Sequence, residues 1–136
     1  MKSKKTIIGF TVLIVLCCVA ISSCSTNKTQ SKEEQAKEEQ AIENFKESAS
    51  KTLNSYDNIK FDINKNLVSV VIDLNTWNAT SETGRTDFMN EIYSLVRIDA
   101  ITSGILDYHD VSVNFMTSDY KNVHPYKKIK KEEQNQ

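Results

Sequence analysis

The sequence has few of the residues on which most catalytic and metal sites depend. Its 136 residues include three cysteines, two histidines, three glycines and one proline. Cys17 and Cys18 lie inside an apolar N-terminal run, which leaves Cys24 as the only cysteine beyond that run. The rest of the chain therefore has no pair of cysteines that would form a disulfide or help to bind zinc.

Familiar catalytic motifs are missing as well. Gly9 lies in the apolar run, and neither Gly84 nor Gly104 belongs to a phosphate-binding loop or to a turn that presents a nucleophilic serine. No HExxH metal-binding motif occurs. These absences favour a protein that is not an enzyme and that binds no cofactor.

One short segment brings several reactive side chains together. Asp107, Tyr108, His109 and Asp110 supply two carboxylates, a phenol and an imidazole in four residues. The spacing fits no known ligand pattern, so a polar turn is the favoured interpretation and a metal or acid–base cluster is the alternative. If the last two strands pair, His124 would lie toward the same end of that pair as His109. A metal ion bound by both histidines is then a further alternative.

The N-terminus has the organisation of a secretory signal. Lys2, Lys4 and Lys5 precede a mainly apolar run from Ile7 to Ile21. A basic start, a short apolar core and small residues after it are typical of a signal peptide. The run is shorter than the roughly 20 apolar residues that a membrane-spanning helix needs.

The end of this run resembles the lipobox of bacterial lipoproteins. That family has an aliphatic residue, two small residues and a cysteine, and Ile21-Ser22-Ser23-Cys24 matches each position. The resemblance implies that the Cys24 thiol receives a diacylglyceryl group and that signal peptidase II cuts between Ser23 and Cys24. The acylated Cys24 would then hold the protein in membrane lipid on the extracytoplasmic face of the cell membrane. The alternative is an uncleaved N-terminal anchor with a free Cys24.

The segment after Cys24 predicts a polar tether. Residues 1–23 contain three of the 17 basic residues and none of the 18 acidic ones, so the remainder carries 14 against 18, a charge of about −4. This mildly acidic balance argues against a nucleic-acid partner. The sequence KEEQA occurs at Lys32–Ala36 and again at Lys37–Ala41, with no apolar stripe for a coiled coil.

Hydrophobic periodicity then predicts two helices and three or four strands. Apolar residues recur at helical spacing from Ile42 to Tyr56 and again from Phe88 to Ile101, with Gly104 as the C-cap. Alternation or branched residues predict strands at Ile59–Ile63, Leu67–Leu74 and Val111–Met116. Asn75–Gly84 is expected to be a loop. A fourth, edge strand is expected from Val123, cut short by Pro125.

We therefore expect a small two-layer α+β domain. Two helices would pack on a sheet of three or four largely antiparallel strands, in the order α-β-β-α-β(-β). The expected organisation is a signal peptide at residues 1–23, a tether at 24–39, the domain at 40–126 and a charged tail at 127–136.

Three residues are candidates for partner binding. Trp77 lies in the expected loop, where tryptophan either anchors a partner or covers the end of the core. Arg85 and Arg97 are the only arginines, and they serve either in recognition or as solvated charge on the second helix. The run Lys127–Lys131 either contacts an anionic surface or forms a solvated tail.

These observations favour a non-catalytic binding or inhibitory module, tethered outside the cell membrane and directed at an envelope protein. The alternative is a small enzyme or metal-dependent module that uses Asp107, His109 and Asp110.

Overall fold

The computed structural model describes residues 31–132. The predicted signal peptide, Cys24, the first part of the tether and residues 133–136 of the tail lie outside this range. Within the described residues, Ala36 begins a compact unit that includes the rest of the range. The fold is described for that unit.

The structure confirms a small α+β domain. The elements follow in the order α2 (Lys32–Leu53), β1 (Ile59–Asn64), β2 (Leu67–Ile72), α3 (Leu74–Ala79), α4 (Glu82–Ser103), η1 (Ile105–Asp107), β3 (Val111–Thr117) and β4 (Asn122–Ile129). The four strands form one sheet in the order β1-β2-β3-β4. β1 pairs with β2 in antiparallel orientation, and β3 pairs with β4 in antiparallel orientation. The central pair, β2 and β3, is parallel.

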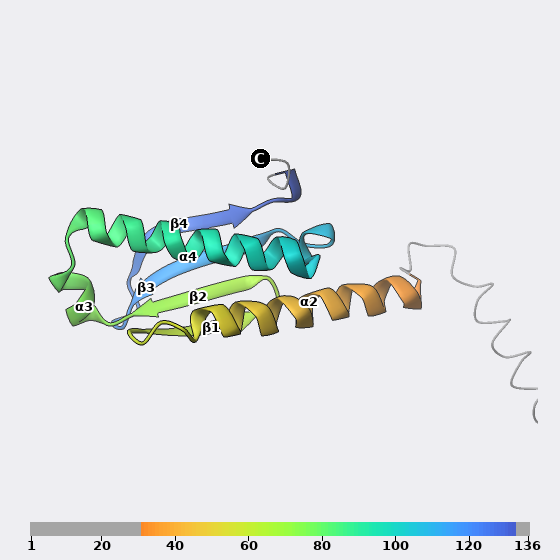
Figure 1. Ribbon diagram of the computed structural model, residues 1–136, viewed down its shortest axis with the longest axis horizontal. Coiled ribbons are helices and arrows are strands. Elements are labelled where there is room, and N and C mark those ends of the chain that lie inside the picture. The colour runs from red at the N-terminus through yellow and green to blue at the C-terminus, as the bar shows by residue number, and fades with distance from the viewer. Residues whose placement is uncertain (1–30, 133–136) are drawn as a thin grey trace, which may run out of the picture. The chain divides into compact units, whose positions relative to one another are not determined.

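The two long helices, α2 and α4, lie together on one side of this sheet (Figure 1). Each helix buries a stripe of apolar residues at helical spacing, as the sequence predicts. The fully buried members include Phe45, Ala49 and Leu53 on α2, and Ile92, Val96 and Ala100 on α4. The two helices are also joined by a hydrogen bond of 2.5 Å from Ser48 Oγ to Asp99 Oδ1.

The strand residues that face the helices alternate with residues on the other face of the sheet. In β2, Val68, Val70 and Ile72 are buried and the residues between them are half-buried. In β3, Val111, Val113 and Phe115 are buried beside them. Period-two burial of this kind is the direct consequence of strand geometry. The core therefore lies between the sheet and the two helices.

The last strand is longer than expected. β4 continues through Pro125 to Ile129, so the prediction that proline would cut it short is wrong. β4 is an edge strand, and proline removes no ladder hydrogen bond if its missing N–H faces away from the neighbouring strand. Shifts in the register between β3 and β4, around Phe115, accommodate this irregular strand.

The expected loop at Asn75–Gly84 contains a helix. Asp73 caps α3 because its carboxylate accepts a hydrogen bond of 2.9 Å from the backbone N–H of Thr76. Ser81 caps α4 in the same way through Gly84, and Gly104 ends α4 with φ of 76° as predicted. A six-residue helix is too short to show a hydrophobic period, so the sequence pattern did not reveal α3.

Candidate functional site

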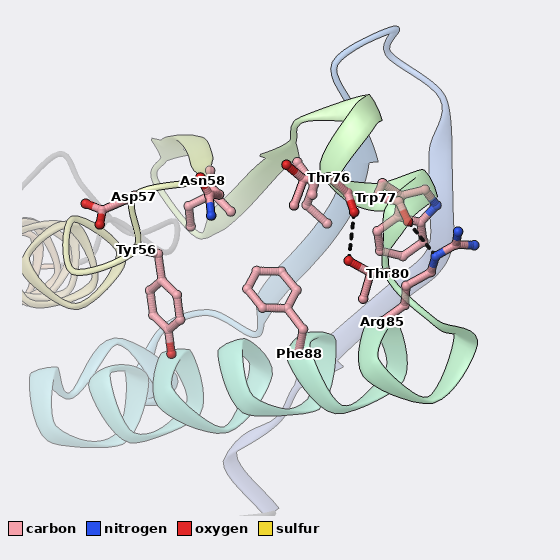
Figure 2. Close-up of a pocket in the computed structure, with 10 residues that line it drawn as sticks. Tyr56, Asp57, Asn58, Thr76, Trp77, Thr80, Arg85 and Phe88 are labelled. Carbon is pink, nitrogen blue, oxygen red and sulfur yellow. Dashed lines mark hydrogen bonds between the residues drawn. The ribbon is translucent and has the colours of Figure 1, made fainter.

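An apolar hollow lies where the α2–β1 connection, β1, β2, α3 and α4 approach one another (Figure 2). We call it the aromatic cleft. Its lining consists of Tyr56, Asp57, Asn58, Ile59, Ile72, Thr76, Trp77, Thr80, Arg85 and Phe88. The cavity measures about 290 Å³ and its exposed lining atoms are mostly apolar. This volume is at the low end for small-molecule pockets, which range over about 300–1,000 Å³.

Two predicted binding residues meet in the cleft. The guanidinium carbon of Arg85 lies 4.8 Å from the centre of the Trp77 ring. Arg85 Nε also donates a hydrogen bond of 2.8 Å to the Trp77 carbonyl oxygen, and one terminal nitrogen donates to Asn78 at 3.4 Å. These carbonyls lie in the last turn of α3, where a cation is favourable. Arg85 therefore orients Trp77 and stabilises α3.

The opposite wall of the cleft is a second aromatic pair. Tyr56 and Phe88 contact edge to face, with ring centres 5.9 Å apart. The Tyr56 hydroxyl donates a hydrogen bond of 2.6 Å to Glu91 Oε1. Burial, this hydrogen bond and the negative charge of Glu91 together raise the pKa of Tyr56 to about 12.

This raised pKa predicts a loss of stability in strong alkali. The folded domain favours the neutral phenol, so its contribution is fully present below the ordinary pKa of 10.0 and disappears as the pH rises through about 12. We expect the phenolate absorbance of Tyr56 to appear near pH 12. The difference between the alkaline titrations of the native chain and Tyr56→Phe isolates this group. A difference centred near pH 10 would contradict the assignment.

A second hollow, of about 340 Å³, adjoins the aromatic cleft. We call it the acidic groove. It shares Asp57, Asn58, Ile59 and Thr76 with the cleft and adds Lys60, Val71, Asp73 and Ser118. Hydrogen bonding, chiefly from the backbone N–H of Thr76, lowers the pKa of Asp73, so this carboxylate is charged at neutral pH. Asp57 has no ionic or hydrogen-bonding partner among the described residues.

Known proteins do not identify this site. Comparison with protein-family models, curated proteins and solved structures finds no match to the chain. The function must therefore be argued from the chemistry of the site itself.

The third predicted binding residue lies outside the cleft. Arg97 follows Arg85 by twelve residues on α4, a rise of about 18 Å along the helix. It does not line either hollow. The structure thus joins Trp77 and Arg85 in one site and separates Arg97 from them.

The residues of the polar segment before β3, 107–110, contact different parts of the domain rather than one another. Asp107 forms an ion pair of 2.8 Å with Lys131, and His109 Nε2 lies 2.6 Å from Glu38 Oε1. The backbone carbonyl of Asp110 accepts a hydrogen bond from Asn66. In residues 31–132, no three His, Cys, Asp or Glu side chains lie close enough together to hold a metal ion.

The expectation that the two histidines share one end of the β3–β4 pair is wrong. His109 precedes Val111, which pairs with Ile129 at one end of the ladder. His124 pairs with Phe115, toward the other end of β3. Because β3 and β4 pair antiparallel, residues just before β3 and early in β4 lie at opposite ends of the ladder.

The contact between Glu38 and His109 draws part of the predicted tether into the domain. Lys65 Nζ also lies 3.6 Å from the same Glu38 oxygen. We expect Glu38→Ala to cost about 1 kcal/mol, because the pair is only partly buried. Melting temperature should fall by roughly 4–8 °C, and amide exchange should accelerate near residue 38.

The matched control for this variant is Glu39→Ala, on the exposed neighbouring position of α2. Equal melting temperatures for the two variants would show that the Glu38 contacts contribute nothing measurable.

The basic segment near the C-terminus is partly engaged by the fold. Lys127 Nζ lies 5.1 Å from the centre of the Tyr93 ring, and Lys131 pairs with Asp107.

No helix in the described part of the chain is both long and apolar enough to cross a membrane.

Proposed function

We propose that the chain is an extracytoplasmic lipoprotein that acts as a non-catalytic binding or inhibitory module at the cell envelope. Acylated Cys24 anchors it in the cell membrane, and the aromatic cleft binds an envelope protein. The membrane part of the proposal rests on the lipobox resemblance at Ile21–Cys24. The binding part rests on the geometry around Trp77.

The observation that carries the binding proposal is the aromatic cleft with its oriented tryptophan. Tryptophan, tyrosine and arginine are the residues that most often dominate binding energy at protein interfaces. Here Trp77 is only half-buried, Arg85 holds its orientation, and Tyr56 and Phe88 form the facing wall. An apolar side chain entering this cleft would lose its contact with water on several sides at once.

We expect Trp77→Ala to weaken partner binding at least about 30-fold, which corresponds to the 2 kcal/mol or more typical of a central interface residue. The experiment is cross-linking in intact cells followed by mass spectrometry. It compares the native chain with Trp77→Ala and with Cys24→Ala.

The matched control is Tyr120→Ala. Tyr120 is 81% exposed and does not line the cleft. An envelope protein that is enriched with the native chain and with Tyr120→Ala, but lost with Trp77→Ala, supports the proposal. Equal enrichment with Trp77→Ala, at an unchanged melting temperature, would exclude the cleft as the binding site.

A further inference from the structure

The two adjoining hollows differ in chemistry, and that difference specifies what they bind. The aromatic cleft is apolar, whereas the acidic groove is lined by both polar and apolar atoms. They share four residues, including Asp57 and Ile59, so they form one continuous surface. An occupant that fills both must combine an apolar group with a polar one.

The size of the cleft selects the apolar group. At about 290 Å³ it lies at the lower limit for small-molecule pockets. The cleft suits one large apolar side chain, which would contact the rings of Tyr56, Phe88 and Trp77. Aromatic rings favour such contacts at short distance, either edge to face or in an offset stack. A single phenylalanine, leucine or methionine side chain matches this shape.

The charges around the groove select the polar group. The acidic groove is lined by two carboxylates, Asp57 and Asp73, and by one cation, Lys60. Asp73 is held in its charged form by the Thr76 N–H, and Asp57 has no partner among residues 31–132. The other cation of the site, Arg85, is directed at the α3 carbonyls rather than at the groove.

Asp57 and Arg85 lie at opposite ends of the cleft, with the aromatic rings between them (Figure 2). The uncompensated charge of the site is therefore negative and lies at the end that opens into the acidic groove. A cationic group is favoured there by charge complementarity.

From this arrangement we infer that the occupant is a segment of the partner protein in which a large apolar residue adjoins a lysine or arginine. The apolar side chain fills the aromatic cleft and the cation lies against Asp57 in the acidic groove. This inference rests on the proposed function and adds the chemistry of the recognised segment.

The test uses Trp77 as its reporter, because it is the only tryptophan of the chain. Three blocked dipeptides, Phe-Lys, Phe-Glu and Gly-Lys, are titrated while Trp77 fluorescence is recorded. We expect Phe-Lys to bind about fivefold more tightly than Phe-Glu at low salt, the scale of an exposed ion pair. This preference should shrink as salt is added, and Gly-Lys should bind at least tenfold more weakly than Phe-Lys.

Asp57→Asn is the decisive variant, and Asp110→Asn is its control with the same change of charge. Asp110 is exposed and precedes β3, away from both hollows. The inference predicts that Asp57→Asn abolishes the preference for Phe-Lys and that Asp110→Asn retains it. Equal binding of Phe-Lys and Phe-Glu to the native chain, or a preference that survives in Asp57→Asn, would overturn it.

Two further results would also overturn the inference. The first is the absence of saturable binding of Phe-Lys up to its solubility limit. The second is self-association that Trp77→Ala abolishes, because a second copy of the chain would then occupy the cleft. The absence of dipeptide binding does not bear on cellular cross-linking through Trp77, so on that result the proposed function is judged separately.

Discussion

Replacement of Cys24 by alanine is expected to abolish incorporation of labelled fatty acid completely. The thiol is the only proposed attachment point, and the peptidase of this pathway acts on the lipidated form. The variant should therefore retain residues 1–23, and its N-terminal peptide should begin at Met1 rather than at an acylated Cys24. Metabolic labelling with palmitate and mass spectrometry of the N-terminal peptide measure both effects.

Cys17→Ala is the matched control for this experiment. Cys17 lies within the part that cleavage removes, so the mature protein should carry the same label as the native chain. Fatty-acid label that persists in Cys24→Ala would show that Cys24 is not the attachment point and that the lipobox interpretation is wrong. A native chain that carries no label and begins at Met1 would favour an uncleaved anchor with a free Cys24.

Phe45→Ala is expected to cost about 3–5 kcal/mol of folding free energy. The Phe45 ring is fully buried between α2 and the sheet, and its removal leaves a cavity that the packed neighbours fill only in part. Because small domains are stable by only about 5–15 kcal/mol, the loss removes a large share of the total. Denaturant unfolding, followed by circular dichroism, measures this change.

Phe61→Ala provides the comparison on the same residue type. Phe61 is half-buried on the edge strand β1, so its replacement should cost clearly less than that of Phe45. Equal midpoints of denaturation for the two variants would contradict the assignment of Phe45 to the centre of the core.

The sequence predicted the helices and strands in which the apolar residues recur over enough positions to show a helical or a two-residue period. The stripe that contains Phe45 and Leu53, and the stripe that contains Ile92 and Val96, both became helices packed on the sheet. Gly104 marked the end of α4 correctly because a left-handed C-cap favours glycine. α3 was missed because its formation depends on one cap, Asp73, and on the packing of its neighbours.

Only some of the residues of the aromatic cleft could be predicted from the sequence. Trp77 and Arg85 were predicted as binding residues, but their stacking depends on the turn between α3 and α4. Tyr56 and Phe88 appeared only as members of two apolar stripes, 32 residues apart. Nothing in the local pattern indicates that the ends of these stripes face each other, because this contact is set by how α2 and α4 pack on the sheet.

Parallel pairing of β2 with β3 delays folding until most of the chain is present. Leu67 pairs with Ser112, 45 positions later, and β3 supplies Val111, Val113 and Phe115 to the core. Contacts between such distant residues slow folding, because the entropy of closing the loop is lost before the contacts form. A nascent chain that lacks β3 has no partner for one edge of β2. For a protein exported as proposed, this topology delays completion of the core until β3 has been synthesised, which favours transport of the chain before it is fully folded.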